Sequence, residues 1–295
     1  MADNAAALPP SPWFRFAPAF FVVMWSSGFI FTKLGMPHTE PFTFLAVRFT
    51  LAAAIFAAIA LAVRARWPAT WREAGHIAAA GTLVQAAYLG GVFWAISRGL
   101  GAGIVALIMG LQPLLTAAAA GVALGERVTA RQWIGLVVGF AGVALVVANR
   151  DFSGTDDVAA LIANGVALVA LAAGVLYQKR HSVNMDLRSG SAIQFGISAA
   201  LAAACALLTE DLRLNWTGEL VLAMGWLVLT LSLGNSLVLL LLIRRGAAAK
   251  VSSLFYLVPA VTALMAFALF DERLSPTALV GMAVAIFGVA LATRN

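Results

Sequence analysis

Residues 125–145 read GERVTARQWIGLVVGFAGVAL, and residues 271–291 read DERLSPTALVGMAVAIFGVAL. The two stretches match without a gap at an offset of 146 residues, and the match extends over residues 98–149 and 244–295. Self-similarity at one fixed distance indicates that the chain holds two copies of a single structural unit. The fold therefore depends on how the two copies are arranged.

The same offset also relates residues near the start of each copy. It carries Gly28 onto Gly174, Lys33 onto Lys179 and Phe49 onto Phe195. Each copy therefore accounts for about half of the chain.

Composition places both copies in a membrane. Of the 295 residues, 62% are hydrophobic and 11% are charged, and the mean hydropathy is +0.94. These values leave too few polar groups to cover a water-facing surface, so the lipid bilayer is an expected partner. The basic residues fall at predicted helix ends rather than on one patch, and this distribution argues against a nucleic-acid partner.

A bilayer core requires about 20 apolar residues per helix. The stretches that satisfy this requirement are residues 17–36, 42–63, 74–97, 102–122, 131–149, 158–180, 190–209, 219–242, 248–270 and 276–293. The predicted fold is therefore an all-α integral membrane protein with ten transmembrane helices. Because each copy has an odd number of crossings, the second five-helix copy is expected to be inverted relative to the first.

The predicted domain organisation follows from these spans. Residues 1–16 are expected to form a short cytosolic tail, and residues 17–149 the first repeat. Residues 150–157 form a non-cytosolic linker loop in this prediction, and residues 158–295 form the second repeat.

The orientation follows from the lysines and arginines of alternate loops, because basic residues resist translocation. With the N-terminus inside, 13 basic residues fall on the cytosolic side and 4 on the opposite side. We therefore expect a multi-pass protein of the bacterial inner (plasma) membrane with both termini in the cytosol. A monomer or a weak homodimer is expected.

Three sets of residues resemble a known family. They are the closing segments 125–145 and 271–291, the proline segments 111–114 and 257–260, and the opening segment 25–29. Together they resemble the EamA repeat of the drug/metabolite transporter superfamily. The resemblance implies a ten-helix carrier, commonly an exporter and without a cofactor, and is greatest to YddG-like exporters of aromatic amino acids.

The substrate site of such a protein is expected at mid-depth, where the repeats meet. The polar and aromatic residues predicted to bind substrate are Trp25, Ser27, Lys33, Gln85, Tyr88, Gln112, Ser232, Asn235, Ser252 and Tyr256. Polar groups are costly when they face lipid, so these side chains are expected to turn inward. Helix–helix hydrogen bonding is the alternative role for each of them.

Two basic residues lie within predicted spans. Arg48 is expected to snorkel to the outer interface or to pair with Glu40. Lys33, near the outer end of the first span, is the candidate for meeting a substrate carboxylate or for gating against a neighbouring residue.

Prolines and glutamates recur in the second half of each repeat. Pro113 and Pro259 are predicted to kink their helices and so to shape a central cavity. Glu126 and Glu272 are predicted to stabilise tight turns at opposite membrane faces, with Thr129 and Ser275 as helix N-caps. A role for the glutamates in proton coupling is the alternative.

Several functions lack the residues that they need. The three histidines lie far apart and Cys205 is the single cysteine, so the sequence predicts neither a metal site nor a disulfide. No Asp or Glu lies near the middle of a predicted span, so uniport or exchange is expected rather than strong proton coupling. Export of neutral or aromatic amino acids is the favoured function. Broad export of drugs or organic cations is the alternative, and a channel, a nucleotide-sugar antiporter and an intramembrane enzyme are less favoured.

Overall fold

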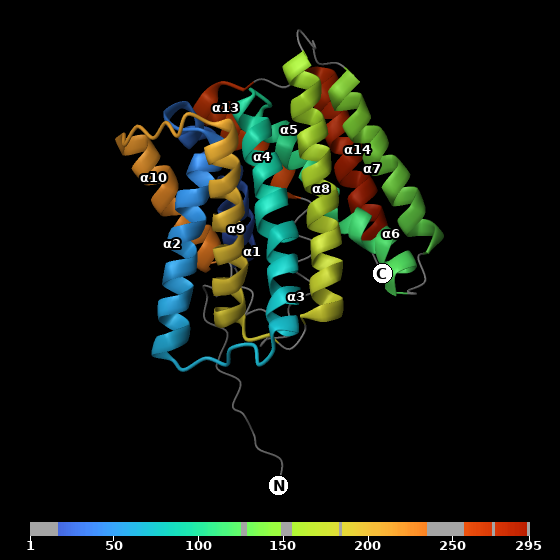
Figure 1. The fold of residues 1–295 in the computed structure, drawn as a ribbon. Helices are drawn as coiled ribbons and strands as arrows, with labels where there is room; N and C mark the ends of the chain where they lie inside the picture. Colours follow the sequence, from blue (N-terminus) through green and yellow to red (C-terminus); the bar gives the residue numbers. More distant parts are fainter. Residues whose placement is uncertain are drawn as a thin grey trace.

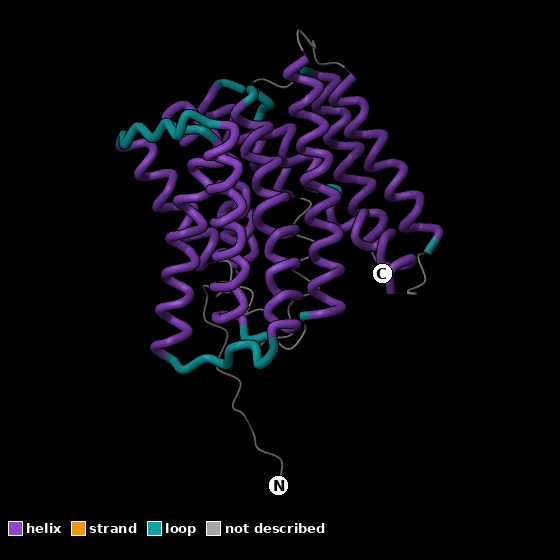
Figure 2. Tube along the Cα trace, viewed as in Figure 1, coloured by secondary structure: helices purple, strands orange, loops and turns teal. Residues whose placement is uncertain are grey.

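A computed structural model describes residues 17–124, 129–148, 155–182, 185–234, 257–272 and 275–293. Over these residues the chain is helical, and the one β pairing is an isolated antiparallel bridge between Thr39 and Leu214. Figure 2 shows helices joined by short loops throughout the described part of the chain. The all-α class predicted from the sequence is therefore confirmed.

The helices of the first half follow one another with short connections (Figure 1). Their bounds are α1 Ala17–Gly35, the 3-10 helix η2 Met36–His38, α2 Pro41–Ala62, α3 Trp71–Gly81, the π-helix η3 Thr82–Ala87, α4 Tyr88–Ser97, α5 Ala102–Met109, α6 Gln112–Leu124 and α7 Ala130–Ala148. The helices of the second half are α8 Thr155–His181, α9 Leu187–Thr209, α10 Gly218–Trp226, the π-helix η4 Leu227–Gly234, α13 Val258–Phe270 and α14 Pro276–Thr293.

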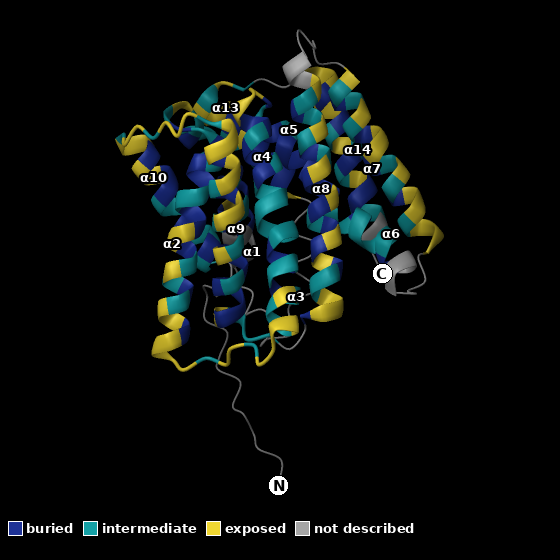
Figure 3. Ribbon diagram, in the orientation of Figure 1, coloured by how far each residue is buried: buried dark blue, intermediate teal, exposed yellow. Residues whose placement is uncertain are grey.

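Helix length and composition make this a membrane protein. Six helical segments have the length and apolar character to cross a bilayer, with mean hydropathies from 1.4 to 2.3. Shorter apolar helices cover residues 218–234, 258–270 and 276–291. Large apolar side chains such as Val137 and Leu264 are more than 60% exposed, and Figure 3 shows exposed residues along the outer faces of the bundle. Lipid is the solvent that suits such faces.

Three helices begin three residues earlier than the hydropathy pattern predicts. Helix α8 begins at Thr155, inside the predicted linker 150–157, α3 begins at Trp71 rather than at residue 74, and α9 begins at Leu187 rather than at residue 190. Their first turns are polar. Thr70 caps α3 by accepting a hydrogen bond from the Glu73 N–H (3.2 Å), and acidic residues near a helix N-terminus are favourable. Because these first turns are polar, a hydropathy pattern places the start of the helix too late.

Helix α2 packs antiparallel to α9, which is its counterpart at the 146-residue offset. At one end the Ser189 hydroxyl donates to the Arg66 carbonyl (2.6 Å), and at the other end Glu210 accepts from the Phe42 N–H (2.7 Å). Between them the counterparts Phe49 and Phe195 touch, with ring centroids 5.9 Å apart. Residues related by the repeat therefore meet each other in the middle of the molecule.

Helix α7 packs against its own counterpart α14 in the same way (Figure 1). A Cβ added to Gly142 would lie 2.6 Å from the Gly281 carbonyl oxygen, and one added to Gly288 would lie 2.7 Å from that of Gly135. Since Gly142 and Gly135 are the counterparts of Gly288 and Gly281, the same contact is made twice along this interface. Only glycine allows two helix backbones to approach so closely.

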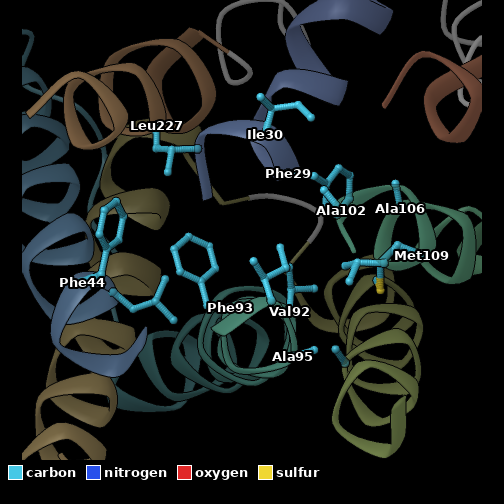
Figure 4. Close-up of a cluster of buried hydrophobic side chains, with 14 of the residues drawn as sticks. Phe29, Ile30, Phe44, Val92, Phe93, Ala95, Ala102, Ala106, Met109 and Leu227 are labelled. Atoms are coloured by element: carbon cyan, nitrogen blue, oxygen red, sulfur yellow. The ribbon is translucent and has the colours of Figure 1, made fainter. Parts of the chain in front are cut away.

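Buried aromatic and aliphatic side chains fill the space between α1, α2, α4 and η4. Figure 4 shows Phe44, Phe93 and Leu227 near one another, and Phe29 beside Ala102. The rings of Phe44 and Phe93 are 5.4 Å apart and tilted by 42°, a geometry that aromatic pairs favour. This cluster holds the walls of the site described below.

The two ends of the bundle differ in their charged residues. The "ion-paired end" comprises the α1–α2 and α4–α5 turns, the α9–α10 connection and the end of α13, and it holds Lys33, Glu40, Glu210 and Glu272. The "arginine-rich end" comprises the α2–α3 and α8–α9 connections, with Arg64, Arg66, Arg180 and Arg188.

Candidate functional site

A cavity of about 240 Å³ lies between α1, α2, η3, α4, α8, α9 and η4. Trp25, Phe29, Phe93 and Phe195 provide aromatic walls. The polar side chains on its surface are Thr32, Arg48, Gln85, Tyr88, Gln178, Ser191, Gln194 and Ser232. Concave sites with apolar walls and a few convergent polar groups are typical of small-molecule binding.

The cavity draws on equivalent positions of the two repeats. Four pairs of lining residues are related by the 146-residue offset: Trp25 with Leu171, Thr32 with Gln178, Arg48 with Gln194, and Gln85 with Leu231. The cavity therefore lies where the two halves of the chain meet. Both halves supply its wall, but with different side chains.

Both halves also place a π-helical segment beside the cavity. Segment η3 carries Gln85 and η4 carries Ser232, and the two segments overlap at the repeat offset. Each packs against a glycine of the other half, because a Cβ on Gly28 would lie 2.7 Å from Leu231 Cδ1 and one on Gly174 would lie 2.6 Å from Val84 Cγ2. π-Helical turns are rare and are found mostly at functional sites.

Arg48 is the one buried cation on the cavity wall among the described residues, and it is 5% exposed. Its Nη2 donates to the Ser232 hydroxyl (3.5 Å), and its guanidinium carbon lies 5.8 Å from the centre of the Phe93 ring. The predicted pairing with Glu40 is wrong. Glu40 lies 3.6 Å from Arg213 at the ion-paired end, whereas Arg48 is buried beside Phe93 of α4 and Ser232 of η4.

Its counterpart Gln194 is also 5% exposed but belongs to an amide network. Gln194 Nε2 donates to Gln178 Oε1 (3.3 Å) and lies 3.9 Å from Met185 Sδ. Met185, Leu187 and Ser191 extend the cavity wall towards the arginine-rich end. No residue of the turns at the ion-paired end belongs to the described lining.

The structure brings four of the predicted substrate-binding residues to the cavity: Trp25, Gln85, Tyr88 and Ser232. Gln112 lines a smaller adjoining cavity of about 40 Å³, which shares Trp25 and Tyr88 with the larger one. Its Nε2 donates to the Thr116 hydroxyl (2.8 Å). Asn235, Ser252 and Tyr256 lie outside the described residues.

Ser27 and Lys33 occupy other places. The Ser27 hydroxyl donates to the Met24 carbonyl (2.6 Å) and accepts from Trp226 Nε1 (2.8 Å), so it joins α1 to α10. Lys33 forms an ion pair with Glu272 and lies 4.8 Å from the centre of the Phe270 ring. Neither residue lines the cavity.

Five polar residues of the wall were absent from the predicted substrate-binding set: Thr32, Arg48, Gln178, Ser191 and Gln194. Two of them, Gln178 and Ser191, lie close to a helix end rather than at mid-depth. The repeat itself could have revealed Gln194, since the offset carries Arg48 onto it.

Both prolines lie in the first turn of a described helix. Gly110 and Leu111 separate α5 from α6, and Pro113 is the second residue of α6, where the missing N–H costs little. Pro259 occupies the first turn of α13 in the same way. The span Ala102–Ala120 is thus interrupted directly before Pro113, as a kink requires, and Pro113 also borders the smaller cavity. Residues 235–256 lie outside the described part of the chain, so the kink at Pro259 stays a prediction.

Glu272 connects three segments at the ion-paired end. Its carboxylate pairs with Lys33 of α1 and accepts from the Ala102 N–H (3.2 Å) at the start of α5. The predicted role of stabilising its own turn is too narrow, because these partners lie far from it in the sequence. Ser275 caps α14 through the Ala278 N–H (3.1 Å), and Thr129 caps α7 through the Gln132 N–H (3.3 Å). Glu126 lies outside the described residues.

Further contacts close the ion-paired end. Glu210, after α9, accepts from the Phe42 and Thr43 N–H groups (2.7 Å each) and so caps α2. Burial opposes ionisation of Glu40, but hydrogen bonds from the Arg213 and Asp211 backbone outweigh it, and the pKa of Glu40 lies below its ordinary value of 4.5. Both carboxylates connect the start of α2 to the segment that follows α9.

An all-helical membrane bundle around an internal cavity with one closed end defines a class of protein, the multi-helix membrane transporters. The family model of the EamA-like transporter family matches residues 16–148 and 159–294, once for each repeat. The chain belongs to the EamA-like transporter family.

Relatives match over nearly the whole chain. The uncharacterized transporter YvbV of Bacillus subtilis (strain 168) is 26% identical over 92% of this chain and 89% of its own length. The uncharacterized inner membrane transporter YedA of Escherichia coli (strain K12) is 27% identical over 92% of this chain and 87% of its own length. A probable amino-acid metabolite efflux pump of the same strain is 25% identical over 91% of this chain and 90% of its own length.

A solved structure shares the fold. This crystal structure of a protein that is 20% identical in sequence superimposes with a TM-score of 0.66, and the superposition covers 94% of this chain and 97% of that chain.

Proposed function

We propose that the protein is a secondary exporter of small organic solutes, with neutral and aromatic amino acids as its favoured substrates. The observation that carries this proposal is the cavity, whose wall is built from equivalent positions of both halves of the chain. A solute held between two such halves can be exposed to either side of a membrane when the halves tilt against each other.

The proposal includes a ten-helix inverted repeat. Antiparallel packing of α2 on α9 and of α7 on α14 supports it, because an inverted copy runs in the opposite direction to its counterpart. The touching counterparts Phe49 and Phe195 support a pseudo-two-fold axis that passes between them.

In this proposal the arginine-rich end faces the cytosol, and both termini are cytosolic in a bacterial inner membrane. The cavity wall extends towards that end through Met185, Leu187 and Ser191. The Lys33–Glu272 ion pair closes the other end. The conformation is then the inward-facing state, ready to load a substrate from the cytosol.

Inverted symmetry gives this ion pair a counterpart at the other end. The offset carries Lys33 onto Lys179 and Glu126 onto Glu272, so the residues equivalent to the pair are Lys179 and Glu126. We propose that the Lys33–Glu272 pair breaks in the outward-facing state and that Lys179 and Glu126 then pair across the cytosolic end.

The cavity suits an aromatic amino acid. Trp25, Phe29 and Tyr88 line both the main cavity and its smaller extension, so a ring can stack there, with each contact worth about 0.5 to 1.5 kcal/mol. The relative named as a probable amino-acid metabolite efflux pump supports the same substrates. Aromatic walls also suit organic cations, which are the alternative substrates.

Counterflow in proteoliposomes tests the proposal. Vesicles that contain the purified protein and unlabelled phenylalanine, with no pH gradient or potential, are expected to accumulate labelled phenylalanine transiently. Exchange of this kind requires a carrier that presents one site to each side in turn. Flux that does not saturate, or that needs an imposed proton-motive force, would contradict the proposal.

A further inference from the structure

We propose that Arg48 is the anchor for a substrate carboxylate, and that the cavity accepts organic acids bearing a single carboxylate whether or not they carry an amino group. This inference rests on the proposed function, which it deepens by naming the group that the site recognises. It depends on the surroundings of one side chain inside the membrane-spanning bundle.

The Arg48 guanidinium is buried without a counter-charge among the described residues. A guanidinium offers five N–H donors, and the described residues supply a single acceptor, the Ser232 hydroxyl at 3.5 Å. The Nε atom is buried without a hydrogen-bond partner in the described part of the chain. A buried charge is costly unless it is paired, so this side chain is poised for an anion that the protein itself does not provide.

Nearby side chains favour an acid that carries a ring. The Arg48 Cζ atom lies 5.8 Å from the centre of the Phe93 ring, within the range of a cation–π contact. Trp25 and Tyr88 line the same cavity. A planar, preorganised guanidinium binds a carboxylate through two parallel hydrogen bonds, an arrangement that lysine cannot reproduce.

The cavity has no matching group for an ammonium. Neither Asp nor Glu belongs to the described lining, and residues 235–256, which lie outside the description, contain neither in their sequence. Gln194, the counterpart of Arg48, is an amide that is bonded to Gln178. Among the described lining residues the site therefore carries one positive charge and no negative one, which attracts acids and repels amines.

Three probes that share a phenyl ring test the inference: phenylalanine, 3-phenylpropionate and phenethylamine. Calorimetric titration of the detergent-solubilised, full-length protein is expected to show that 3-phenylpropionate binds at least as tightly as phenylalanine. Phenethylamine is expected to bind about tenfold more weakly or worse, since it lacks the charge-assisted hydrogen bonds. This comparison needs no variant, so it stands even if a substitution prevents folding.

Substitution identifies the anchor. Arg48→Gln, which copies the residue at the equivalent position, is expected to weaken binding of both acids on the order of 10- to 100-fold, and Arg48→Lys is expected to restore part of the loss. The matched control is Arg72→Gln, an exposed arginine at the start of α3, which is expected to bind both acids as the unaltered protein does.

The inference is overturned if Arg48→Gln binds 3-phenylpropionate within twofold of the unaltered protein, or if phenethylamine binds more tightly than the acids. The second result would favour the organic-cation alternative. Counterflow separates the two proposals. If acids bind through Arg48 but are not exchanged, the transport function is contradicted and the anion site is supported. If phenylalanine is exchanged equally well without Arg48, the anion site is contradicted and the transport function is supported.

Discussion

The two halves of the molecule are alike where they pack against each other and unlike where they face the cavity. Packing positions keep their residue type across the 146-residue offset, as in Phe49 and Phe195 or Gly142 and Gly288. Cavity positions change it, as in Arg48 and Gln194. Shared positions therefore build a symmetric frame, and divergent positions give the cavity a chemical preference that a fully symmetric site would lack.

The largest expected effect comes from the glycine interface between α7 and α14. Gly142→Leu places a side chain where a Cβ alone lies 2.3 Å from the Ala285 nitrogen. We expect a loss of more than about 3 kcal/mol of stability, beyond the usual cost of overpacking, and little folded protein, because neither backbone can move away.

Thermal unfolding in detergent measures this loss. Gly196→Leu on α9 is the matched control, since nothing lies within 4 Å of the Cβ position there. Equal melting temperatures for the two variants would show that the close helix contact is not needed.

The next effect tests the central axis of the frame. Phe49→Ala and Phe195→Ala each remove one ring of a buried contact, and the two residues are 0% and 4% exposed. Each substitution is expected to cost about 3 kcal/mol. Similar losses in unfolding experiments would support symmetric packing, and a loss confined to one variant would break the comparison between the halves.

The sequence predicts the packing between the halves better than it predicts the wall of the cavity. Helix positions follow from apolar runs, which are a local pattern. The glycine contacts follow from small residues that recur at the repeat offset. The burial of Arg48 could not be predicted this way, since its neighbours Phe93 of α4 and Ser232 of η4 are distant in the sequence. The π-helical turns around Gln85 and Ser232 also lack a local signal, because their hydrogen-bond register is set by packing.

The proposed pairs of Lys33 with Glu272 and of Lys179 with Glu126 sharpen the comparison further. Glu272→Gln is expected to favour the outward-facing state, and Glu126→Gln the inward-facing state, each by roughly fivefold, as partly exposed ion pairs are worth about 1 kcal/mol. Rates of efflux and uptake in oriented vesicles report these shifts, and shifts of the same sign for both variants would contradict inverted symmetry.

The smallest expected effect concerns Glu40, whose counterpart is Asp186. Because the pKa of Glu40 is lowered in the folded protein, its ionised form adds stability above pH 4.5, and this stability is lost as the pH falls through the folded-state pKa. The difference in melting temperature between the unaltered protein and Glu40→Gln is expected to be small at pH 7 and to vanish in acid. A difference that grows as the pH falls would contradict this assignment.

The central claim is that the cavity opens to one side of the membrane at a time. Accessibility of Thr32 tests it most directly, because Thr32 lines the cavity and precedes the ion-paired Lys33 in the sequence. With Cys205 replaced by Ala, Thr32→Cys is expected to react with an impermeant maleimide from the cytosolic side. Adding Glu272→Gln is expected to move the reaction towards the opposite side, and phenylalanine should slow both reactions. If Thr32→Cys, with Glu272 unaltered, reacted from both sides at equal rates or from neither side, the result would contradict a cavity that opens to one side at a time.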